Sequence, residues 1–369
     1  MNGKTILILV NKQTTVINFR LEVVAALVKS GYSVHVSVPE GDRLGEIEAV
    51  GANVIKTDVA RHGTNPLEDF KLMLQYRKLI WEIRPDLVLT YTIKPNIYGG
   101  MASALCGVPY IANITGLGTA VENGGLMQKL TLFLYKLGLR KAKKVFFQNT
   151  ENRRFFETHK IACGKHDSLP GSGVNLTKFQ LLPYPQGDTV EFGFVSRIMK
   201  EKGIGQYIDT AKAIREKYPN TRFHVVGFGE PEHEEQMRQL DTEGVLVFHG
   251  LSNDVRKEIQ NFHCVIHPTF YPEGMSNVLL ESAASGRPII STDRFGCREA
   301  IDDGVNGFIV RECDSADLIE KTERFLQLTP QEREEMGKRG REKMEREFDR
   351  NIVVQKYLDA AAQYTAQKE

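Results

Sequence analysis

The stretch "YPEGMSNVLLESAASG", residues 271–286, combines the apolar composition of a buried helix with two carboxylates, Glu273 and Glu281. A helix that is apolar on most sides is expected in a protein core, and a charge in such a core is costly unless a partner compensates it. Either Glu281 lies on a narrow solvated edge of the helix, or the two carboxylates bind a ligand. The apolar residues that predict burial are Met275, Val278, Leu279, Leu280, Ala283 and Ala284.

The sequence on both sides of this stretch alternates between short apolar runs and amphipathic segments. Runs such as "TILILV" (5–10) and "DLVLTYT" (86–92) are typical of parallel strands that are buried on both faces. Amphipathic segments such as 66–85 and 203–219 lie between the runs, and this alternation predicts parallel sheets with helices on both faces. We therefore expect an α/β fold with two doubly wound, Rossmann-like domains that face a cleft.

The length and one irregular segment predict where the domains divide. A chain of 369 residues is too long for one typical core. The strand–helix rhythm breaks at residues 168–188, which contain three prolines and three glycines. We predict a first domain at 1–170, a linker at 171–188 and a second domain at 189–349. Residues 350–369 have no further strand beside which to pack, and we expect a C-terminal helix that crosses back to the first domain.

The composition, 41% apolar and 26% charged, is that of a globular protein. Five cysteines without a close pair are expected to be reduced thiols, and no cluster of ligands predicts a metal site. No window reaches 18 apolar residues, so we expect no membrane-spanning helix. The net charge of +1 hides an asymmetry, because residues 1–170 carry +8 and residues 171–369 carry −7. The two halves are therefore expected to meet different partners.

Ligands of doubly wound domains bind beyond the carboxyl ends of the strands. Arg197 and Lys202 place positive charge at a strand–helix turn, where it can neutralise a diphosphate without a metal; the alternative is an ordinary basic surface loop. Gly274 allows a close backbone approach, and Ser276 can cap the following helix, whose free N–H groups form an anion site. The segments that fall at strand ends are "SRIMKEKG" (196–203), "VGFGEPE" (226–232) and "HPTFYPEGMSN" (267–277).

The spacing of the two carboxylates suits a nucleotide-sugar. Glu273 and Glu281 are about 12 Å apart by the rise of a helix, which is near the span from a sugar ring across a diphosphate to a ribose. A carboxylate accepts hydrogen bonds from vicinal hydroxyls. The pattern therefore places Glu281 at a ribose, Arg197 and Lys202 at a diphosphate, and Glu273 at the sugar.

The segments "SRIMKEKG", "YPEGMSNVLLESAASGRPIISTD" and "PGSGVNLTKF" resemble the retaining glycosyltransferases of family four, which have the GT-B fold. The two glutamates separated by seven residues are the most specific part of this resemblance. It implies metal-independent transfer with retention at the anomeric carbon, driven by stabilisation of the leaving group. The catalytic residues that it implies are Arg197, Lys202 and Glu273, and the donor contacts are Gly227, Gly274, Met275, Ser276, Asn277 and Glu281.

The first half of the chain resembles a narrower branch of the same family. The segments "VINFRLEVVAALVKSG" (16–31), "YTIKPNIYG" (91–99) and "NITGLGTAVENGG" (113–125) are similar to enzymes that extend polyprenyl-diphosphate-linked sugars for bacterial O-antigens, capsules or protein glycans. The chain departs from the pattern at "NKQTT", where many members have a glycine-rich loop, and at Ile93–Lys94, where several members have a His. The acceptor contacts that the resemblance implies are Arg20, Lys94, Thr115, Gly116 and Gly118.

Residues 126–147, "LMQKLTLFLYKLGLRKAKKVFF", hold six Lys and Arg and no Asp or Glu. Interpreted as one helix, they are basic and amphipathic, as are helices that lie on anionic membranes. One alternative is an ordinary helix that packs on the sheet with its cations in water. A nucleic-acid surface is another, but the second half is acidic and no nucleic-acid motif occurs. The expected membrane contacts are Lys129, Phe133, Lys136, Arg140, Lys141 and Lys144.

These patterns and the resemblance together predict a retaining, metal-independent glycosyltransferase without a cofactor. By resemblance, the donor is a UDP-sugar, such as UDP-GalNAc, and the acceptor is a polyprenyl-diphosphate-linked saccharide of O-antigen, capsule or N-glycan assembly. We expect a cytoplasmic protein, peripheral on the inner face of the cell membrane, that binds no nucleic acid. Two alternatives stay open: a UDP-sugar epimerase of the same fold, and a non-catalytic partner that binds nucleotide-sugars.

Overall fold

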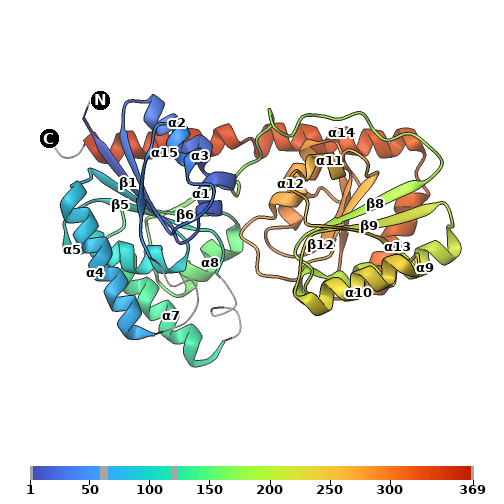
Figure 1. Cartoon of the computed structure of the whole chain (residues 1–369), viewed down its shortest axis with the longest axis horizontal. Helices are drawn as coiled ribbons and strands as arrows, with labels where there is room; N and C mark the ends of the chain where they lie inside the picture. The colour runs from blue at the N-terminus through green and yellow to red at the C-terminus, as the bar shows by residue number, and fades with distance from the viewer. Residues whose placement is uncertain (1–2, 59–64, 118–120, 122–123, 367–369) are drawn as a thin grey trace. The chain divides into compact units, whose positions relative to one another are not determined.

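The computed structural model describes residues 3–58, 65–117, 121 and 124–366, and the chain divides into two compact units (Figure 1). Unit 1 consists of Met1–Gly173, Pro272–Met275 and Asn351–Glu369, and unit 2 consists of Val174–Tyr271 and Ser276–Arg350. Each unit has its own parallel sheet. The prediction of two doubly wound α/β domains in series is therefore confirmed.

Unit 1 is built on a seven-stranded parallel sheet with the order β3-β2-β1-β4-β5-β6-β7. Successive residues of β1 enter different cores: Ile6 and Ile8 belong to one apolar cluster, and Leu7 and Leu9 belong to the other. This burial on both faces explains why the strand is a continuous apolar run in the sequence. The strands are β1 (Thr5–Leu9), β2 (Ser33–Val38), β3 (Asn53–Lys56), β4 (Leu87–Tyr91), β5 (Tyr110–Ile114), β6 (Lys144–Phe147) and β7 (His166–Ser168).

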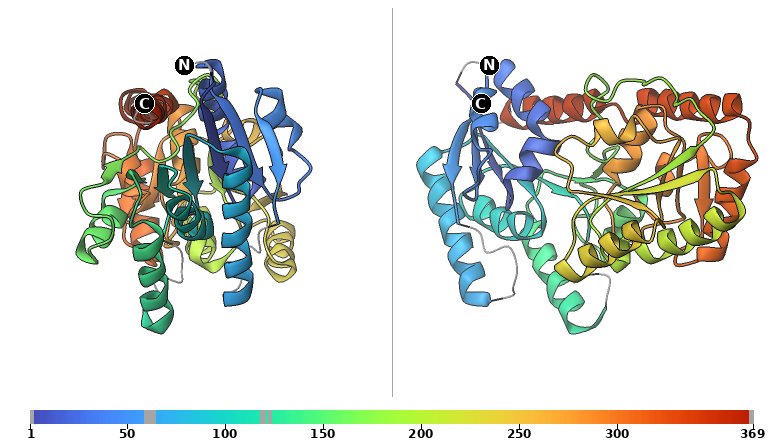
Figure 2. Two further views of the ribbon diagram at one scale, coloured as in Figure 1. Left: turned by 90° about the vertical axis from the view of Figure 1, so that its left-hand side faces the viewer. Right: turned by 45° about the vertical axis from the view of Figure 1, so that its right-hand side comes forward.

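Helices cover both faces of this sheet (Figure 2). The last helix, α15 (Arg350–Thr365), contributes Val353 and Tyr357 to the core of unit 1, so the prediction that the C-terminal helix returns to the first domain is confirmed. On the same face lie α1 (Gln13–Phe19), α2 (Leu21–Lys29) and α3 (Gly45–Ala49). The other face carries α4 (Pro66–Ile83), the π-helix η1 (Pro95–Gly99), α5 (Gly100–Leu105), α7 (Gly125–Gly138) and α8 (Thr150–Thr158).

Unit 2 has a six-stranded parallel sheet with the order β10-β9-β8-β11-β12-β13. The strand order reverses between β8 and β11, as it does between β1 and β4 of unit 1, and ligands of such sheets bind at the carboxyl ends of strands beside the reversal. The strands are β8 (Val190–Val195), β9 (Thr221–Val226), β10 (Val247–Gly250), β11 (Cys264–His267), β12 (Ile289–Thr292) and β13 (Gly307–Val310). The helices are η2 (Lys200–Lys202), α9 (Ile204–Lys217), α10 (Pro231–Thr242), α11 (Arg256–Ile259), α12 (Asn277–Ala284), η3 (Arg298–Ala300), α13 (Ser315–Leu326) and α14 (Pro330–Glu347).

The segment expected to be a linker, residues 171–188, belongs mostly to unit 2. The N–H of Val174 donates to the carbonyl of Phe348 at 2.8 Å, and the Tyr184 hydroxyl donates to the carbonyl of His263 at 2.9 Å. The Arg287 guanidinium is fully buried and donates to the Pro183 carbonyl at 2.8 Å. These hydrogen bonds attach residues 174–188 to unit 2. The boundary between the units consequently lies between Gly173 and Val174.

The prediction of one helix over residues 126–147 is wrong. Helix α7 ends at Gly138, whose carbonyl accepts a hydrogen bond from the Tyr110 hydroxyl at 2.6 Å. Strand β6 then begins at Lys144 and lies between β5 and β7, with Phe146 and Phe147 fully buried. Of the predicted membrane contacts, Lys129, Phe133 and Lys136 are exposed on α7, whereas Arg140 and Lys141 follow the helix and Lys144 opens the strand.

Within the part of the chain that the structure describes, no helix has the length and hydropathy that crossing a membrane requires. The same residues contain no group of three or more His, Cys, Asp or Glu side chains arranged to hold a metal ion.

Candidate functional site

The cationic turn of unit 2 is fixed to the loop between β11 and α12. Gly203, which ends the turn, has φ 79°, and a Cβ added there would lie 2.1 Å from the Pro268 carbonyl oxygen. The Glu201 carbonyl accepts hydrogen bonds from the Phe270 N–H at 2.9 Å and from the Thr269 hydroxyl at 3.1 Å. Only glycine fits at this position, and the turn that carries Lys202 is therefore held in one place.

Tyr271 holds the two predicted diphosphate-binding cations together. The Lys202 ammonium lies 4.7 Å from the centre of the Tyr271 ring, and the Arg197 guanidinium lies 5.4 Å from it. Both distances are within the range of cation–π attraction. The Tyr271 carbonyl is itself fixed by the Arg294 guanidinium at 3.0 Å. The sequence reasoning missed this tyrosine, although an aromatic residue two positions before Glu273 was a visible signal.

A second residue that the sequence reasoning missed is His267, the last residue of β11. Its side chain is buried, and neither ring nitrogen has a hydrogen-bond partner. Burial, assisted by the positive charge of Lys202, holds the pKa of His267 well below its usual range. The imidazole therefore stays neutral beside the cationic turn, and Lys202 supplies the charge there.

The amino end of α12 presents polar groups that the helix itself does not use. The first N–H groups of any helix lack intrahelical acceptors, and Ser276, at the cap position, makes no side-chain capping hydrogen bond. The carbonyl oxygen of the Asn277 side chain is buried without a partner. This end of α12 can accommodate an anion or sugar hydroxyls.

Glu281 lies on α12, four residues after Asn277, and its side chain is half-buried. Burial raises the pKa of Glu281 to about 7, and Arg350 and Lys178 oppose this shift. Among the described residues no ion pair joins its carboxylate to a cation. The Glu281 carboxylate is therefore partly withdrawn from water and has no close cationic partner among the described residues. Hydroxyl groups of a ligand would stabilise a carboxylate in such a position.

The segment Pro272–Met275 clusters with unit 1 although it leads directly into α12. The Asn149 side chain donates to the carbonyls of Glu273 at 3.2 Å and Gly274 at 2.7 Å. A Cβ on Gly274 would lie 2.0 Å from the Thr115 carbonyl oxygen. The predicted donor residues Glu273 and Gly274 thus lie beside Thr115 and Gly116, which were predicted to bind the acceptor, and Met275 packs against the position of Gly171.

Gly227 follows β9 with φ 157°, and a Cβ there would lie 1.8 Å from the Ser196 carbonyl oxygen. It therefore allows the loops after β8 and β9 to lie in contact, next to Arg197. Of the predicted donor residues, unit 2 holds Arg197, Lys202, Gly227, Ser276, Asn277 and Glu281.

The predicted acceptor residues of unit 1 differ in their surroundings. Arg20 is buried, donates to the Phe19 carbonyl at 2.7 Å and lies 5.3 Å from the Tyr91 ring centre; no described carboxylate pairs with it. Lys94 forms an ion pair of 2.8 Å with Asp69, which also accepts from the Tyr98 hydroxyl, so its charge is already compensated. Gly118 lies outside the described residues.

The backbone shows two irregularities just after the carboxyl end of β4. Thr92 has φ 71°, which is unusual for a β-branched residue, and its buried hydroxyl has no partner. The π-helix η1 follows at Pro95–Gly99, and such segments occur frequently at functional sites. Arg20, Tyr91 and Thr92 therefore place unpaired polar groups beside the strand-order reversal of unit 1.

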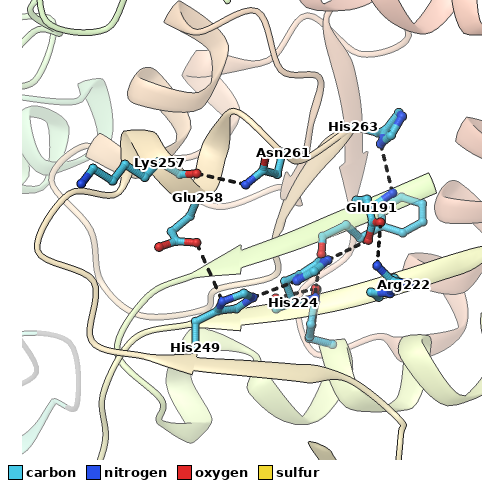
Figure 3. A network of polar contacts seen from close by, with 10 residues as sticks. Glu191, Arg222, His224, His249, Lys257, Glu258, Asn261 and His263 are labelled. Carbon is cyan, nitrogen blue, oxygen red and sulfur yellow. Dashed lines mark hydrogen bonds and ion pairs between the residues drawn. The ribbon is translucent and has the colours of Figure 1, made fainter. Parts of the chain in front are cut away.

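A polar network connects neighbouring strands of the sheet of unit 2 (Figure 3). The His224 Nε2 lies 2.7 Å from the Glu191 carboxylate, and the His224 Nδ1 lies 2.9 Å from the His249 Nε2. His263 accepts a hydrogen bond from the Glu191 N–H at 3.1 Å, as the figure also shows. Burial lowers the pKa of His224 and lowers the pKa of His263 to about 4, with Arg333 assisting at His263.

We expect acid to destabilise unit 2 because these imidazoles, with that of His267, are buried in the neutral form. The unfolded chain binds protons below its ordinary histidine pKa, about 6.5, whereas the folded unit does not. Stability is therefore complete above pH 6.5 and falls as the pH decreases, by about 1.4 kcal/mol per pH unit for each such group. Urea unfolding of the chain at pH 7.5 and 5.5 measures the effect, and His263→Asn should reduce the difference. Equal midpoints at the two pH values would contradict this prediction.

Comparisons with known proteins agree with the two-unit architecture. The model of the family described as glycosyl transferases group 1 matches residues 184–343, and the family described as glycosyl transferase 4-like matches residues 5–149. The chain is 25% identical to the N,N'-diacetylbacillosaminyl-diphospho-undecaprenol alpha-1,3-N-acetylgalactosaminyltransferase of Campylobacter jejuni, over 93% of this chain and 94% of that protein. It is 26% identical to the capsular polysaccharide biosynthesis glycosyltransferase CapM of Staphylococcus aureus, over 88% of each.

Among solved structures, the chain is similar to Anabaena HepE in complex with UDP. The TM-score is 0.80 at 16% identity, and the match covers 98% of this chain and all of that chain. At this identity the likeness concerns the fold.

Proposed function

Because the chain belongs to the group 1 glycosyltransferases and has their GT-B architecture, we propose that it transfers an N-acetylhexosamine from a UDP-sugar to a polyprenyl-diphosphate-linked saccharide. The observation that carries the donor half of this proposal is the pair of cations, Arg197 and Lys202, on the ring of Tyr271 at the carboxyl end of the sheet. The acceptor half rests on the near full-length likeness to the C. jejuni transferase, whose name specifies a diphospho-undecaprenol acceptor and N-acetylgalactosamine.

The residues of unit 2 then have distinct roles. Arg197 and Lys202 stabilise the charge that develops on the leaving diphosphate, which is the step that fixed cations accelerate most. The free N–H groups of α12 and the Ser276 hydroxyl donate to phosphate or sugar oxygens, and the side-chain carbonyl of Asn277 accepts from a sugar hydroxyl. Glu281 accepts hydrogen bonds from the ribose.

In unit 1 the acceptor contacts of this proposal are Arg20, Thr115 and Gly116. Arg20 brings a buried positive charge without a described carboxylate partner to the carboxyl end of the sheet, which suits an anionic diphosphate. Lys94 is less suited to this role because Asp69 already pairs with it.

A lipid-linked acceptor requires contact with the membrane surface, and α7 supplies it in this proposal. Its exposed apolar residues follow one another at helical spacing, and exposed Lys129 and Lys136 accompany them. Helix α4 carries a similar row, so both helices lie at the inner face of the cell membrane in this account. The exposed apolar residues are Leu126, Met127, Leu130, Phe133 and Leu137 on α7, and Leu67, Phe70, Leu74 and Trp81 on α4.

The experiment that tests the proposed function is a mass-spectrometric screen of UDP-sugars against polyprenyl-diphosphate-linked saccharides, with EDTA present. We expect one added N-acetylhexosamine at a rate that EDTA leaves nearly intact. Loss of the activity in EDTA, with recovery in Mg²⁺ or Mn²⁺, would contradict metal independence. Release of an epimer without any acceptor would favour the epimerase alternative.

We expect Glu281→Gln to weaken UDP binding by roughly 10- to 100-fold, because a hydrogen bond to a charged group contributes about 1.5–3 kcal/mol. The turnover number should change less, since a ribose contact is present in both the ground and transition states. The wild-type affinity should also fall as the pH decreases through about 7, because the protonated Glu281 carboxyl is the weaker acceptor. Calorimetry with UDP measures both effects.

The wild type and the Glu281→Gln variant are compared at each pH, because the titration of the UDP phosphate affects both affinities equally and drops out of their ratio. Glu320→Gln, which changes an exposed carboxylate on α13, is the matched control. An affinity that Glu281→Gln leaves unchanged at pH 8 would remove Glu281 from the ribose site.

A further inference from the structure

Two adjoining cavities lie at the amino ends of the strands of unit 1, at the opposite edge of the sheet from the proposed acceptor residues. Each has a volume of about 660 Å³, and both include Val108, which precedes β5. We call them the apolar cavity, between α4 and α5, and the cationic cavity, between the turn after α7 and the start of β7. The function proposed above places Leu74 and Trp81, which line the apolar cavity, at the membrane, but it assigns a ligand to neither cavity.

Hydrophobic side chains line the apolar cavity, and several of them are exposed to water. Trp81 is 69% exposed and Leu105 is 65% exposed, and Leu74 lies beside them. Exposed apolar groups that gather around a hollow mark an interaction site more strongly than the same groups scattered over a surface. Tryptophan in particular is favoured at the boundary between water and lipid. The rim of this cavity also carries cations, Arg77 and Arg84 among them.

The cationic cavity gathers four positive charges, from Arg140, Lys141, Lys143 and Lys165, and no Asp or Glu lines it. No ion pair joins these four side chains to a carboxylate in the described part of the chain. Burial, and after it the neighbouring charge of Lys143, lower the pKa of Lys165, because both disfavour the charged ammonium. Such a cluster is stabilised by an anion.

Interaction of the cations with free carbonyls at a helix carboxyl end explains only part of the cationic cavity. Cations near a helix carboxyl end stabilise its free carbonyls, and Lys165 does donate to the Arg140 carbonyl at 2.7 Å. The Lys143 carbonyl is approached by the Tyr364 hydroxyl at 3.4 Å. Arg140, Lys141 and Lys143 are not used in this way, and their charges remain available to a ligand.

We propose that the two cavities bind one anionic phospholipid, with its phosphate in the cationic cavity and an acyl chain in the apolar cavity. The shared boundary at Val108 permits one amphiphile to occupy both. The rows of exposed apolar residues on α4 and α7 lead to this place, because Leu74 and Trp81 line the apolar cavity and α7 ends shortly before Arg140. The inference rests on the membrane contact of the proposed function and adds a specific headgroup site to it.

Trp81 is the only tryptophan of the chain, so its fluorescence reports directly on the apolar cavity. We expect short-chain phosphatidylglycerol, below its micelle concentration, to shift the emission of the full-length protein to shorter wavelength. Zwitterionic phosphatidylcholine of the same chain length should bind at least 10-fold more weakly. The double variant Lys143→Gln/Lys165→Gln should weaken phosphatidylglycerol binding by roughly 30-fold, since each lost charge contributes about fivefold.

The control is Lys29→Gln/Lys160→Gln, which removes two exposed lysines that line neither cavity. Equal affinity for the two lipids, or wild-type affinity of the Lys143/Lys165 variant, would overturn the proposal. Full competition by glycerol 3-phosphate would also overturn it, because the site would then belong to a soluble phosphate ester. The assay contains no donor or acceptor sugar, so failure of sugar transfer with intact lipid binding would overturn the proposed function alone.

Discussion

Lys202→Ala and Arg197→Ala are each expected to lower the turnover number by about 10²–10³-fold at saturating donor, the loss found when one stabilising group for a developing anion is removed. Lys202 should matter at least as much as Arg197 because it is buried and Arg197 is exposed. A buried charge acts through a lower effective dielectric constant. Both variants should still bind the lipid acceptor, whose proposed contacts lie in unit 1.

Lys200 provides the matched control for this experiment. It lies in the same η2 turn, two residues before Lys202, and its side chain is exposed. Lys200→Ala should therefore leave the rate within about twofold, because among the described cations Arg197 and Lys202, and not Lys200, lie over the Tyr271 ring. Rates of the Lys202 and Arg197 variants within a few-fold of the wild type would remove both residues from leaving-group stabilisation.

The second large effect is expected at the membrane. Leu130→Ser combined with Phe133→Ser should weaken binding to anionic vesicles by at least 100-fold, because each buried apolar side chain of this size contributes about 1.5–3 kcal/mol. Phe133 is 57% exposed and Leu130 is 46% exposed, so their replacement should not disturb the core of unit 1. Vesicle sedimentation measures the binding.

The control exchanges two exposed aliphatic residues of unit 2, Leu181 and Val305, for serine. Activity on a water-soluble acceptor analogue should survive in the α7 variant, while activity on the natural lipid should fall. Lys144 is not a suitable target for this test, because it pairs with Asp167 at 3.1 Å and its reversal would repel that carboxylate. Vesicle binding that persists in the α7 variant would show that this helix is not the membrane contact.

The sequence predicted the parallel sheets well because burial on both faces leaves a direct signal. Ile6 to Leu9 are all apolar, since alternate residues enter two different cores. The helix over 126–147 was predicted wrongly because composition does not mark where a helix ends. The basic run continues through the turn after Gly138 into β6, and only pairing with β5 and β7 shows that Lys144 to Phe147 form a strand.

The candidate site was predictable where it depends on charge and spacing, and not where it depends on side-chain packing. Arg197 and Lys202 could be predicted because fixed charges at strand ends are visible in the sequence, and Glu281 because a carboxylate stands out in an apolar helix. Their roles stay predictions. Tyr271 and His267 were missed because their roles come from a ring and an imidazole that neighbouring loops bring against Lys202. The linker was placed too broadly because prolines and glycines indicate irregular backbone, but do not show that Tyr184 is buried against His263.

The most direct test of sugar transfer is a nuclear magnetic resonance time course with UDP-GalNAc, vesicles and the lipid-linked acceptor, followed at the anomeric proton of the sugar. We expect the donor signal to be replaced by that of a new α-linked product, only when acceptor is present, with UDP released in equal amount. An epimer signal without acceptor, a β-linked product, or tight UDP binding without any turnover across the donors and acceptors tested would contradict a retaining glycosyltransferase.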